Sequence, residues 1–210
     1  LATISNAKNE MLSPDEYENL ASGRYQETVA RIYKLYQHNL RKNSAVDFDD
    51  LLNLTNQLFA KDKPTLAYFQ DMIEHVLVDE YQDTNKAQYQ LTKYFTKPQN
   101  NLFVVGDFSQ SIYAWRGADY KNMMKIKADF PDLKEYRLEQ NYRSTQSILD
   151  AATQVISKNI SHPILDLWTK NTEATKLTHL ETDSGETEAM EVMKKIKGLV
   201  SHDYSDMAIL

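Results

Sequence analysis

The sequence predicts an α/β fold in which helices flank a parallel sheet. Two short apolar runs, at residues 76–78 and 102–105, each end abruptly in a polar pair, and the stretch between them has the apolar spacing of an amphipathic helix. The pairs are Asp79-Glu80 and Gly106-Asp107. Strand, helix and strand joined by short connections form a βαβ unit with parallel strands. We therefore expect both pairs at the sheet edge where such folds bind ligands.

The segment before the first strand is predicted to be helical. Ser13-Pro14-Asp15-Glu16 has the pattern of a capping box with proline in the first helical position, so a helix should begin there. Apolar residues at helical spacing predict a long helix or a pair of helices over residues 25–40, a second helical segment after Asp47 and a third near residues 66–73.

The remaining elements are predicted from the same signals. Thr84 is expected to cap the helix between the two strands, and Ser144 a later helix. Apolar spacing predicts helices at residues 120–130 and from about Thr187, and residues 135–139 have the pattern of a third strand.

Composition excludes several classes of function. The chain has no cysteine, so disulfides, thiolate catalysis and cysteine-based zinc sites are excluded, and its five histidines lack metal-ligand spacing. The net charge of −6 argues against a protein that coats nucleic acid electrostatically, but it leaves room for a local groove that binds single strands by stacking. No apolar run approaches the ~18 residues of a membrane span. We therefore expect no membrane partner and a cytoplasmic location.

The chain is expected to be an internal piece of a longer protein. It begins with Leu1 instead of methionine, and it stops within an apolar run, residues 207–210, that has the pattern of a strand interior.

Asp79-Glu80 is the first candidate site. In nucleotide hydrolases an acid at this position holds Mg²⁺, and a second acid positions or deprotonates the attacking water. An acidic dipeptide after a strand is more often a solvated turn. The polar side chains of residues 81–84, immediately beside the pair, shift the balance toward a site.

A second group of candidates follows the second strand. Gly106 lets the backbone turn sharply, and Gln110 is suited to hydrogen-bonding a phosphate oxygen and reporting its loss after hydrolysis. Tyr113 and Trp115 lie in a loop beside Arg116. A loop aromatic belongs to a satellite core about as often as not, but two of them beside an arginine indicate a platform for stacking bases.

A third group spans residues 138–145. Arg143 lies near a predicted helix N-terminus, where an anion is favoured, and its planar guanidinium matches phosphate geometry. Tyr142 offers a flat face to a purine. In isolation, a surface arginine and a half-buried tyrosine would be the simpler interpretation.

In this order and spacing, the three segments resemble the superfamily 1 DNA helicases of the UvrD, PcrA and Rep group. Residues 79–85 resemble helicase motif II, residues 105–119 motif III and residues 138–145 motif IV. The string Asp47-Phe48-Asp49-Asp50-Leu51-Leu52 resembles the acidic–hydrophobic segment that precedes motif II. Phe108 and Ser109 depart from the small or acidic residues common at those positions, which puts local detail in doubt.

The resemblance implies ATP and Mg²⁺ as cofactors. Asp79 would coordinate Mg²⁺, Glu80 would be the catalytic base and Gln110 would sense the γ-phosphate. Tyr142 would stack on adenine, and Arg143 would contact the γ-phosphate across a domain cleft.

The resemblance also implies nucleic-acid partners. Tyr113 and Trp115 would stack on single-stranded DNA, with Arg116 in the same region. The implied activity is ATP-driven 3′–5′ translocation on single strands and duplex unwinding at single-strand/duplex junctions, in DNA repair or replication. The remainder of the helicase chain would be a further partner.

For the fold, the resemblance implies a partial RecA-like parallel sheet in three segments. Residues 1–45 would end an inserted helical subdomain, residues 46–133 would complete a first RecA-like motor domain, and residues 134–210 would begin a second. None of the five glycines begins the Gly-Lys-Thr or Gly-Lys-Ser of a P-loop, so the chain alone is expected to lack ATPase activity.

Two alternatives remain open from the sequence. The chain could be a truncated, non-catalytic relative kept for DNA or protein contacts, or part of an AddA-like nuclease-helicase subunit. Tyr81, Tyr142 and the Trp-Arg-Gly-Ala string at residues 115–118 favour the UvrD, PcrA and Rep group over AddA and RecB.

Overall fold

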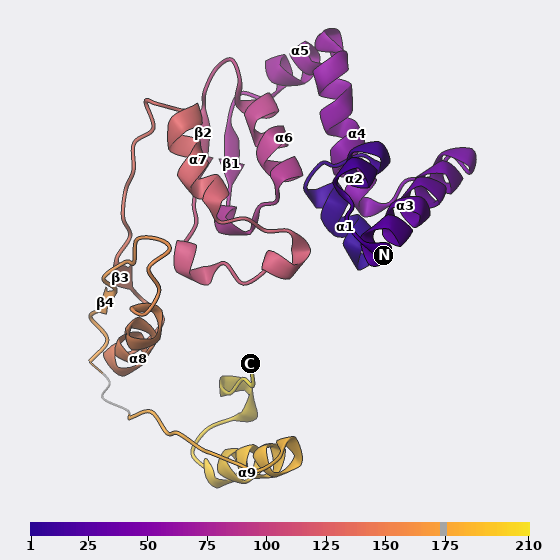
Figure 1. Cartoon of the computed structure of the whole chain (residues 1–210). Coiled ribbons are helices and arrows are strands. Elements are labelled where there is room, and N and C mark those ends of the chain that lie inside the picture. Colours follow the sequence, from indigo (N-terminus) through magenta and orange to yellow (C-terminus); the bar gives the residue numbers. More distant parts are fainter. Residues whose placement is uncertain (173–175) are drawn as a thin grey trace. The chain divides into compact units, whose positions relative to one another are not determined.

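The computed structural model describes residues 1–172 and 176–210, which form two compact units (Figure 1). The first unit comprises Leu1–Leu138 and Ile156–Leu165, and the second comprises Glu139–Val155 and Asp166–Leu210. Helices and short parallel strands make up both units, so the predicted α/β class is confirmed.

The first unit begins with three packed helices, α1 (Ala2–Asn9), α2 (Pro14–Leu20) and α3 (Arg24–Lys42). The predicted capping box at Ser13 is present, because the Ser13 hydroxyl accepts from the Glu16 amide while the Glu16 carboxylate accepts from the Ser13 amide. Helix α1 was not predicted. Its Ile4 and Ala7 pack against Tyr33 of α3 in a small apolar core.

Helix α4 (Phe48–Lys61) follows Asp47, whose carboxylate accepts from the Asp50 amide as an N-cap. Lys8 of α1 is buried against this helix start, with its ammonium 2.6 Å from the Asp47 carboxylate and 2.8 Å from that of Asp50. Burial raises the pKa of Asp47, but the hydrogen bonds it accepts, led by the one from Lys8, outweigh this and hold the pKa below its ordinary value. A buried ion pair thus joins α1 to α4.

The sheet of the first unit consists of β1 (Val76–Val78) and β2 (Leu102–Val104), which run parallel with Val76 opposite Leu102. Helix α5 (Lys63–Met72) precedes β1, and α6 (Lys86–Thr96) connects the two strands. Strand, helix and parallel strand follow one another as predicted.

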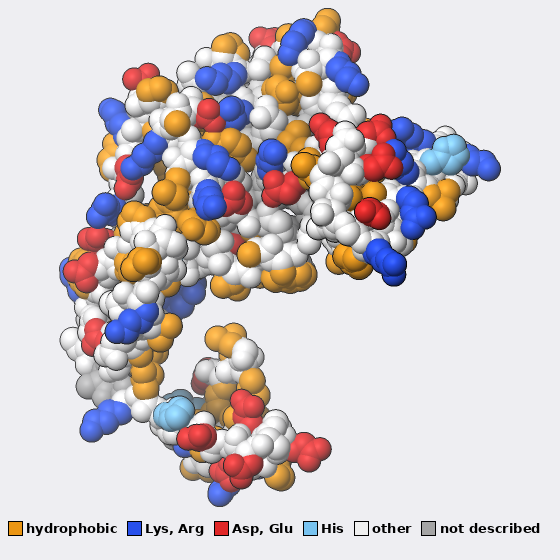
Figure 2. Space-filling model, viewed as in Figure 1, with side chains coloured by type: hydrophobic (Ala, Val, Ile, Leu, Met, Phe, Trp, Pro, Cys, Tyr) orange, Lys and Arg blue, Asp and Glu red, His pale blue; other side chains and the backbone are white. Residues whose placement is uncertain are grey.

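Alternation along the strands divides the sheet into a covered and an open face. Val78, Leu102 and Val104 pack against a core of four buried residues from the turn after β1, from α6, from α7 (Lys121–Asp129) and from the residue after α7. These are Tyr81, Tyr89, Ile126 and Phe130. On the opposite face Leu77 is 72% exposed and Phe103 is 61% exposed. Apolar side chains reach the surface elsewhere as well (Figure 2).

The predicted cap of α6 was wrong by one residue. Asn85 caps the helix, with its side chain accepting from the Gln88 amide and the Gln88 side chain accepting from the Asn85 amide. The Thr84 hydroxyl instead donates to the Tyr81 carbonyl, because it is needed to close the turn after β1. Asparagine and threonine are both good cap residues, so local propensity alone did not separate them.

The second unit contains β3 (Gln140–Asn141), α8 (Gln146–Ile156), β4 (Trp168–Thr169) and α9 (Gly185–Gly198). The strand predicted at residues 135–139 is wrong: that segment is irregular, and pairing begins at Gln140, where Trp168 lies opposite. A strand needs a neighbour, and β4 reaches only two residues. The helix expected after Ser144 begins at Gln146, and the Ser144 amide donates to the Asn141 side chain.

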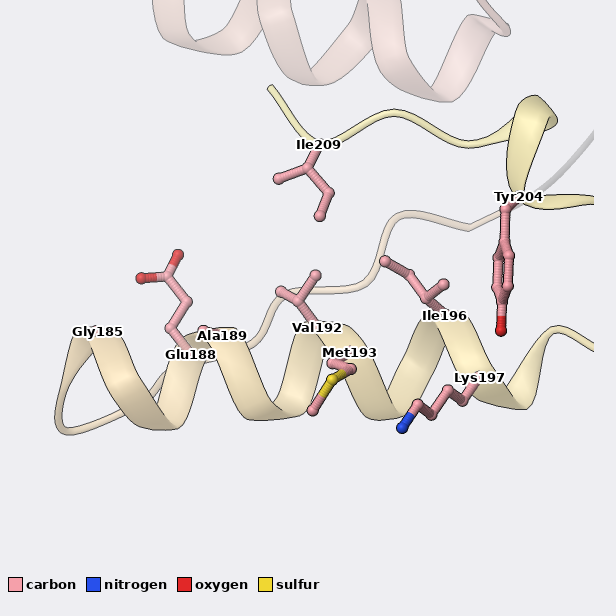
Figure 3. Close-up of a pocket in the computed structure, with 9 residues that line it drawn as sticks. All are labelled: Gly185, Glu188, Ala189, Val192, Met193, Ile196, Lys197, Tyr204 and Ile209. Carbon is pink, nitrogen blue, oxygen red and sulfur yellow. The ribbon is translucent and has the colours of Figure 1, made fainter.

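An open apolar groove of about 550 Å³ runs along α9. Figure 3 shows Val192 and Ile196 pointing from the helix toward Ile209, with Tyr204 near the end of the helix. None of the candidate site residues lines this groove. In the described part of the chain, no helix has both the length and the apolar character needed to cross a membrane.

Because Lys8 is paired with carboxylates in the interior, we expect its removal to destabilise the fold. Lys8→Met should lower the free energy of unfolding by ~3–5 kcal/mol, because it leaves the Asp47 and Asp50 carboxylates buried without their cation. Urea unfolding followed by far-UV circular dichroism would measure this. The control is Lys34→Met, which removes exposed contacts to Asp15 and Glu18 and should change stability little. Equal losses for both variants would contradict the importance of the buried pair.

Candidate functional site

The ends of β1 and β2 lie side by side, which places the two polar pairs at one edge of the sheet. The Val105 amide donates to the Val78 carbonyl at 2.9 Å, and the Tyr81 amide donates to the Val105 carbonyl at 2.9 Å. These bonds continue the parallel ladder past the last strand residues. Asp79-Glu80 therefore lies directly beside Gly106-Asp107, as the βαβ pattern predicts.

Both carboxylates of the first pair are exposed at this edge. The Asp79 carboxylate accepts from the Glu80 amide at 2.9 Å. Glu80 has a φ of +50°, in the left-handed region that residues other than glycine seldom occupy. A single 3₁₀ turn, Tyr81–Asp83, follows immediately. Such backbone strain is concentrated at functional sites, where the surrounding structure holds it in place.

Gln82 connects the two strand ends. Its side chain is almost completely buried, at 1% exposure, and both ends of its amide are engaged. The Nε2 donates to Glu80 Oε2 at 2.7 Å, and the Oε1 accepts from the Asp107 amide at 3.0 Å. Sequence reasoning treated Gln82 only as a polar neighbour of the acids, because the amide's partner on the second strand is 25 residues away.

Asp107 extends this connection to Gln110. Its carboxylate accepts from the Ser109 amide at 2.9 Å and from Gln110 Nε2 at 2.9 Å. The Gln110 side chain is exposed beside the acids. Glu80, Gln82, Asp107 and Gln110 thus form one continuous series of hydrogen bonds across the sheet edge. Asp107 was not predicted as a site residue, although its position after the second strand was the available signal.

Phe108, which departs from the family pattern, has a packing role. Its ring stacks on His162 with centroids 5.8 Å apart and planes 14° apart, and Tyr120 meets the same imidazole edge-on. This contact joins the turn after β2 to the Ile156–Leu165 segment of the first unit. The departure is therefore accommodated within the first unit.

Asp83 links the acidic turn to the aromatic loop. Burial raises the pKa of the Asp83 carboxylate, and the negative charge of Glu80 raises it further. The nearby backbone amides of Tyr113 and Ile112 lower this pKa, but burial outweighs them. The loop that carries the candidate stacking residues is joined to the acidic segment on both sides, because the Ser111 hydroxyl donates to the Gln82 carbonyl at 3.3 Å and the Asp119 amide donates to the Thr84 carbonyl at 3.1 Å.

The aromatic side chains of this loop face solvent. Trp115 is 67% exposed and Tyr113 is 39% exposed, and their ring centroids lie 6.4 Å apart with planes at 52°. An exposed Trp115 excludes the satellite-core interpretation for this residue. The predicted third member, Arg116, has a side chain that lies outside the described residues.

Helix α1 supports the loop from behind. Gly117 has a φ of +83°, and a Cβ there would lie 2.8 Å from the Cβ of Asn9. The Asn9 side chain also accepts from Asn85 Nδ2 at 2.8 Å. One residue of α1 therefore contacts both the loop and the cap of α6.

The carboxylates can accommodate a magnesium ion. Mg²⁺ is usually held by one or two carboxylates together with waters and substrate phosphates, and the exposed Asp79 at the sheet edge meets that need. Among the described residues no group of three or more His, Asp or Glu side chains could form an all-protein metal cage. The donor set therefore fits a metal shared with a phosphate ligand.

Tyr142 and Arg143 belong to the second unit, directly after β3. The Asn141 side chain accepts from the Arg143 amide at 2.9 Å and from the Ser144 amide at 2.7 Å, which turns the chain from the strand toward α8. Both predicted side chains are exposed, Tyr142 at 84%. This excludes a half-buried tyrosine, and it leaves both groups accessible to a ligand.

Comparison with known proteins identifies the family. The model of the UvrD/REP helicase N-terminal domain matches residues 1–131, and that of the UvrD-like helicase C-terminal domain matches residues 136–210. The chain therefore belongs to the UvrD/REP helicase family, as its motifs predicted.

Individual relatives are similar over the whole of this chain. It is 45% identical to the ATP-dependent DNA helicase PcrA of Leuconostoc citreum, 44% to that of Bacillus subtilis and 43% to that of Staphylococcus aureus. In each case the match covers 100% of this chain but only 28–29% of the relative. The chain thus spans less than a third of the length of these relatives.

Because the ends of β1 and β2 approach closely at Gly106, we expect substitution of this glycine to destabilise the fold. In Gly106→Ala the new Cβ would lie 2.7 Å from Gln82 Oε1, so the buried amide must move and the bond to the Asp107 amide should weaken. We expect a loss of ~1–3 kcal/mol in the free energy of unfolding, measured by urea titration. Gly198→Ala is the control, because a Cβ there meets nothing within 4 Å. A neutral Gly106→Ala would show that the packing at this edge is loose.

Proposed function

We propose that this chain is the central part of the motor of an ATP-dependent DNA helicase, one that translocates 3′ to 5′ on single-stranded DNA and unwinds duplexes in DNA repair or replication. The observation that carries the proposal is the sheet edge at which Glu80, Gln82, Asp107 and Gln110 form one hydrogen-bonded series. Membership of the UvrD/REP helicase family supports it.

The nucleotide would be bound at this edge. Asp79 would hold Mg²⁺, which when bound neutralises charge on the β- and γ-phosphates. The carboxylate of Glu80 would accept a proton from the attacking water, and the Gln110 amide would hydrogen-bond the γ-phosphate. The exposure of these three side chains supports the assignment, because each must reach a ligand in solvent.

The second unit would supply the remaining contacts to ATP. Tyr142 would stack on adenine, and Arg143 would stabilise charge that develops on the γ-phosphate during transfer. Binding and release of the nucleotide would then draw together and separate two RecA-like domains. In this proposal residues 1–45 end an inserted helical subdomain, residues 46–133 complete the first motor domain and residues 134–210 begin the second.

DNA would be bound by the aromatic loop. Tyr113 and Trp115 would stack on successive bases, with Arg116 nearby, and the bond from the Ser111 hydroxyl to the Gln82 carbonyl would connect base binding to the acidic turn. Single-strand/duplex junctions and the remainder of the helicase chain are the proposed partners, and the cytoplasm is the proposed location. Because a Gly-Lys-Thr loop is missing from these 210 residues, the chain alone would be inactive.

A chimera tests the proposed catalysis. We expect the isolated chain to show no DNA-stimulated ATP hydrolysis above blank. Residues 1–210 substituted for the matching segment of the Leuconostoc citreum helicase, which is 45% identical, should restore it. Glu80→Gln in that chimera should lower kcat on the order of 100-fold or more, because it removes the general base. A coupled phosphate-release assay with and without single-stranded DNA measures both.

The outcomes separate two functions. An active chimera that loses activity in Glu80→Gln supports the helicase motor. A folded chimera that binds DNA but never hydrolyses ATP would instead support a non-catalytic binding module. Turnover by the isolated chain that Glu80→Gln abolishes would contradict the expected inactivity.

The same chimera tests the DNA platform. Trp115→Ala should weaken binding of a fluorescein-labelled oligothymidine on the order of 10-fold, because base–aromatic stacking is worth ~1–3 kcal/mol. Fluorescence anisotropy would measure the dissociation constant. Tyr68→Ala, which removes a similarly exposed aromatic side chain from α5, should leave it unchanged. Equal binding by the Trp115 variant and the parent chimera would remove Trp115 from the platform.

A further inference from the structure

The buried amide of Gln82 is placed between an exposed acid and a backbone group of the second strand end. Its side chain is 1% exposed, whereas the Glu80 carboxylate that it bonds is exposed. An extended polar side chain is buried at a cost unless its polar atoms are satisfied. Here Nε2 donates to Glu80 Oε2 and Oε1 accepts from the Asp107 amide, so both ends are satisfied.

A free glutamate side chain at this position would sample several rotamers. Glu80 follows the strand in a left-handed conformation, and its carboxylate lies at the solvent-facing edge. The 2.7 Å bond from Gln82 holds one carboxylate oxygen, Oε2, and leaves Oε1 outside that bond. A general base acts efficiently only when its oxygen is held near the proton it accepts.

We propose that Gln82 is a positioning residue that orients the Glu80 carboxylate for catalysis and makes this orientation depend on the turn after β2. This inference rests on the proposed function of Glu80 as the base. Gln82 acts only through Glu80, because its side chain is 1% exposed and bonds Oε2 of that carboxylate from behind the edge.

The orientation of Glu80 depends on the turn after β2 because of the second hydrogen bond of the Gln82 side-chain amide. Gln82 Oε1 is held by the Asp107 amide, and the Asp107 carboxylate is held by Gln110 Nε2 at 2.9 Å. Gly106 allows this approach, because any Cβ there would lie 2.7 Å from Gln82 Oε1. The Ser111 hydroxyl also donates to the Gln82 carbonyl at 3.3 Å. Gln110 is therefore linked to Glu80 through the carboxylate and backbone amide of Asp107 and the side chain of Gln82.

Two substitutions test the two hydrogen bonds of the Gln82 side chain, one by removing a single bond and the other by removing both. Gln82→Glu keeps an acceptor for the Asp107 amide but replaces the donor to Glu80 by a second carboxyl oxygen. Gln82→Met keeps the length of the side chain and loses both bonds. Gln88→Glu is the matched control, because Gln88 caps α6 through its side-chain oxygen, which glutamate also supplies.

The first measurement uses the 210-residue chain itself. Amide hydrogen exchange followed by NMR should show the Asp107 amide protected in the parent chain and in Gln82→Glu. In Gln82→Met the same amide should exchange at least about 10-fold faster. Unchanged protection in a folded Gln82→Met would overturn the link between the strand ends. This result does not depend on ATPase activity.

The second measurement uses the chimera with the Leuconostoc citreum helicase. Both Gln82 variants should lower kcat on the order of 10-fold or more while KM for ATP changes less than about twofold, because base orientation is lost and nucleotide contacts remain. Gln88→Glu should match the parent. A purely structural role would instead lower the melting temperature and raise KM together with the fall in kcat, and that pattern in both variants would overturn the proposal.

The Glu80→Gln chimera distinguishes a failure of the proposed function of Glu80 from a failure of the proposed positioning role of Gln82. If Glu80→Gln retains hydrolysis, the proposed function of Glu80 fails, whatever the Gln82 variants do. If Glu80→Gln is inactive while both folded Gln82 variants keep the parent kcat, the positioning role fails and the function of Glu80 stands. If one Gln82 variant does not fold, the kcat and KM of the other still decide between these outcomes.

Discussion

The short parallel pairing of β1 with β2 is the constraint on which the site depends. Only three residue pairs form the ladder, with Val76, Leu77 and Val78 opposite Leu102, Phe103 and Val104, yet this register sets which polar residues meet at the edge. A slip of β2 by one residue would turn its side chains over, placing Phe103 in the core and exposing Leu102 and Val104. The buried Gln82 amide reinforces the register, because its bond to the Asp107 amide is satisfied only when the two strand ends are aligned.

Buried polar contacts also connect the N-terminal helices to this edge. Lys8 joins α1 to the start of α4, and the next residue, Asn9, contacts both Asn85 and Gly117. Removing one partner of such a buried contact lowers the free energy of unfolding, so these contacts stabilise the position of α1. The aromatic loop therefore rests on a helix that is itself held by an ion pair. In the proposed motor, the inserted helical segment would help to determine where Trp115 presents its ring.

Several elements were predictable because their signals are local. The capping box at Ser13, the helix start after Asp47 and the parallel strands around α6 were all found where their sequence patterns placed them. The motifs at residues 79–85 and 105–119 predicted the family, which the comparisons confirm. Other predictions failed where two local choices were equivalent or where pairing decided the outcome. Thr84 and Asn85 are both good cap residues, and Asn85 is the one that caps α6. A strand at residues 135–139 would need a neighbouring strand, but β4 pairs only with Gln140 and Asn141.

The sequence by itself determined the helix starts after Ser13 and Asp47, the βαβ order and the residues proposed for the candidate site. Each of these depends on spacing within a few positions. The tertiary structure alone decided that Gln82 is buried between Glu80 and Asp107, that Lys8 is an interior cation and that Asn9 supports the aromatic loop. These contacts join residues 25 to 100 or more positions apart or invert the usual exposure of a polar side chain. No local pattern encodes such contacts, since they are formed only when packing brings distant segments together and burial makes an unpaired polar group costly.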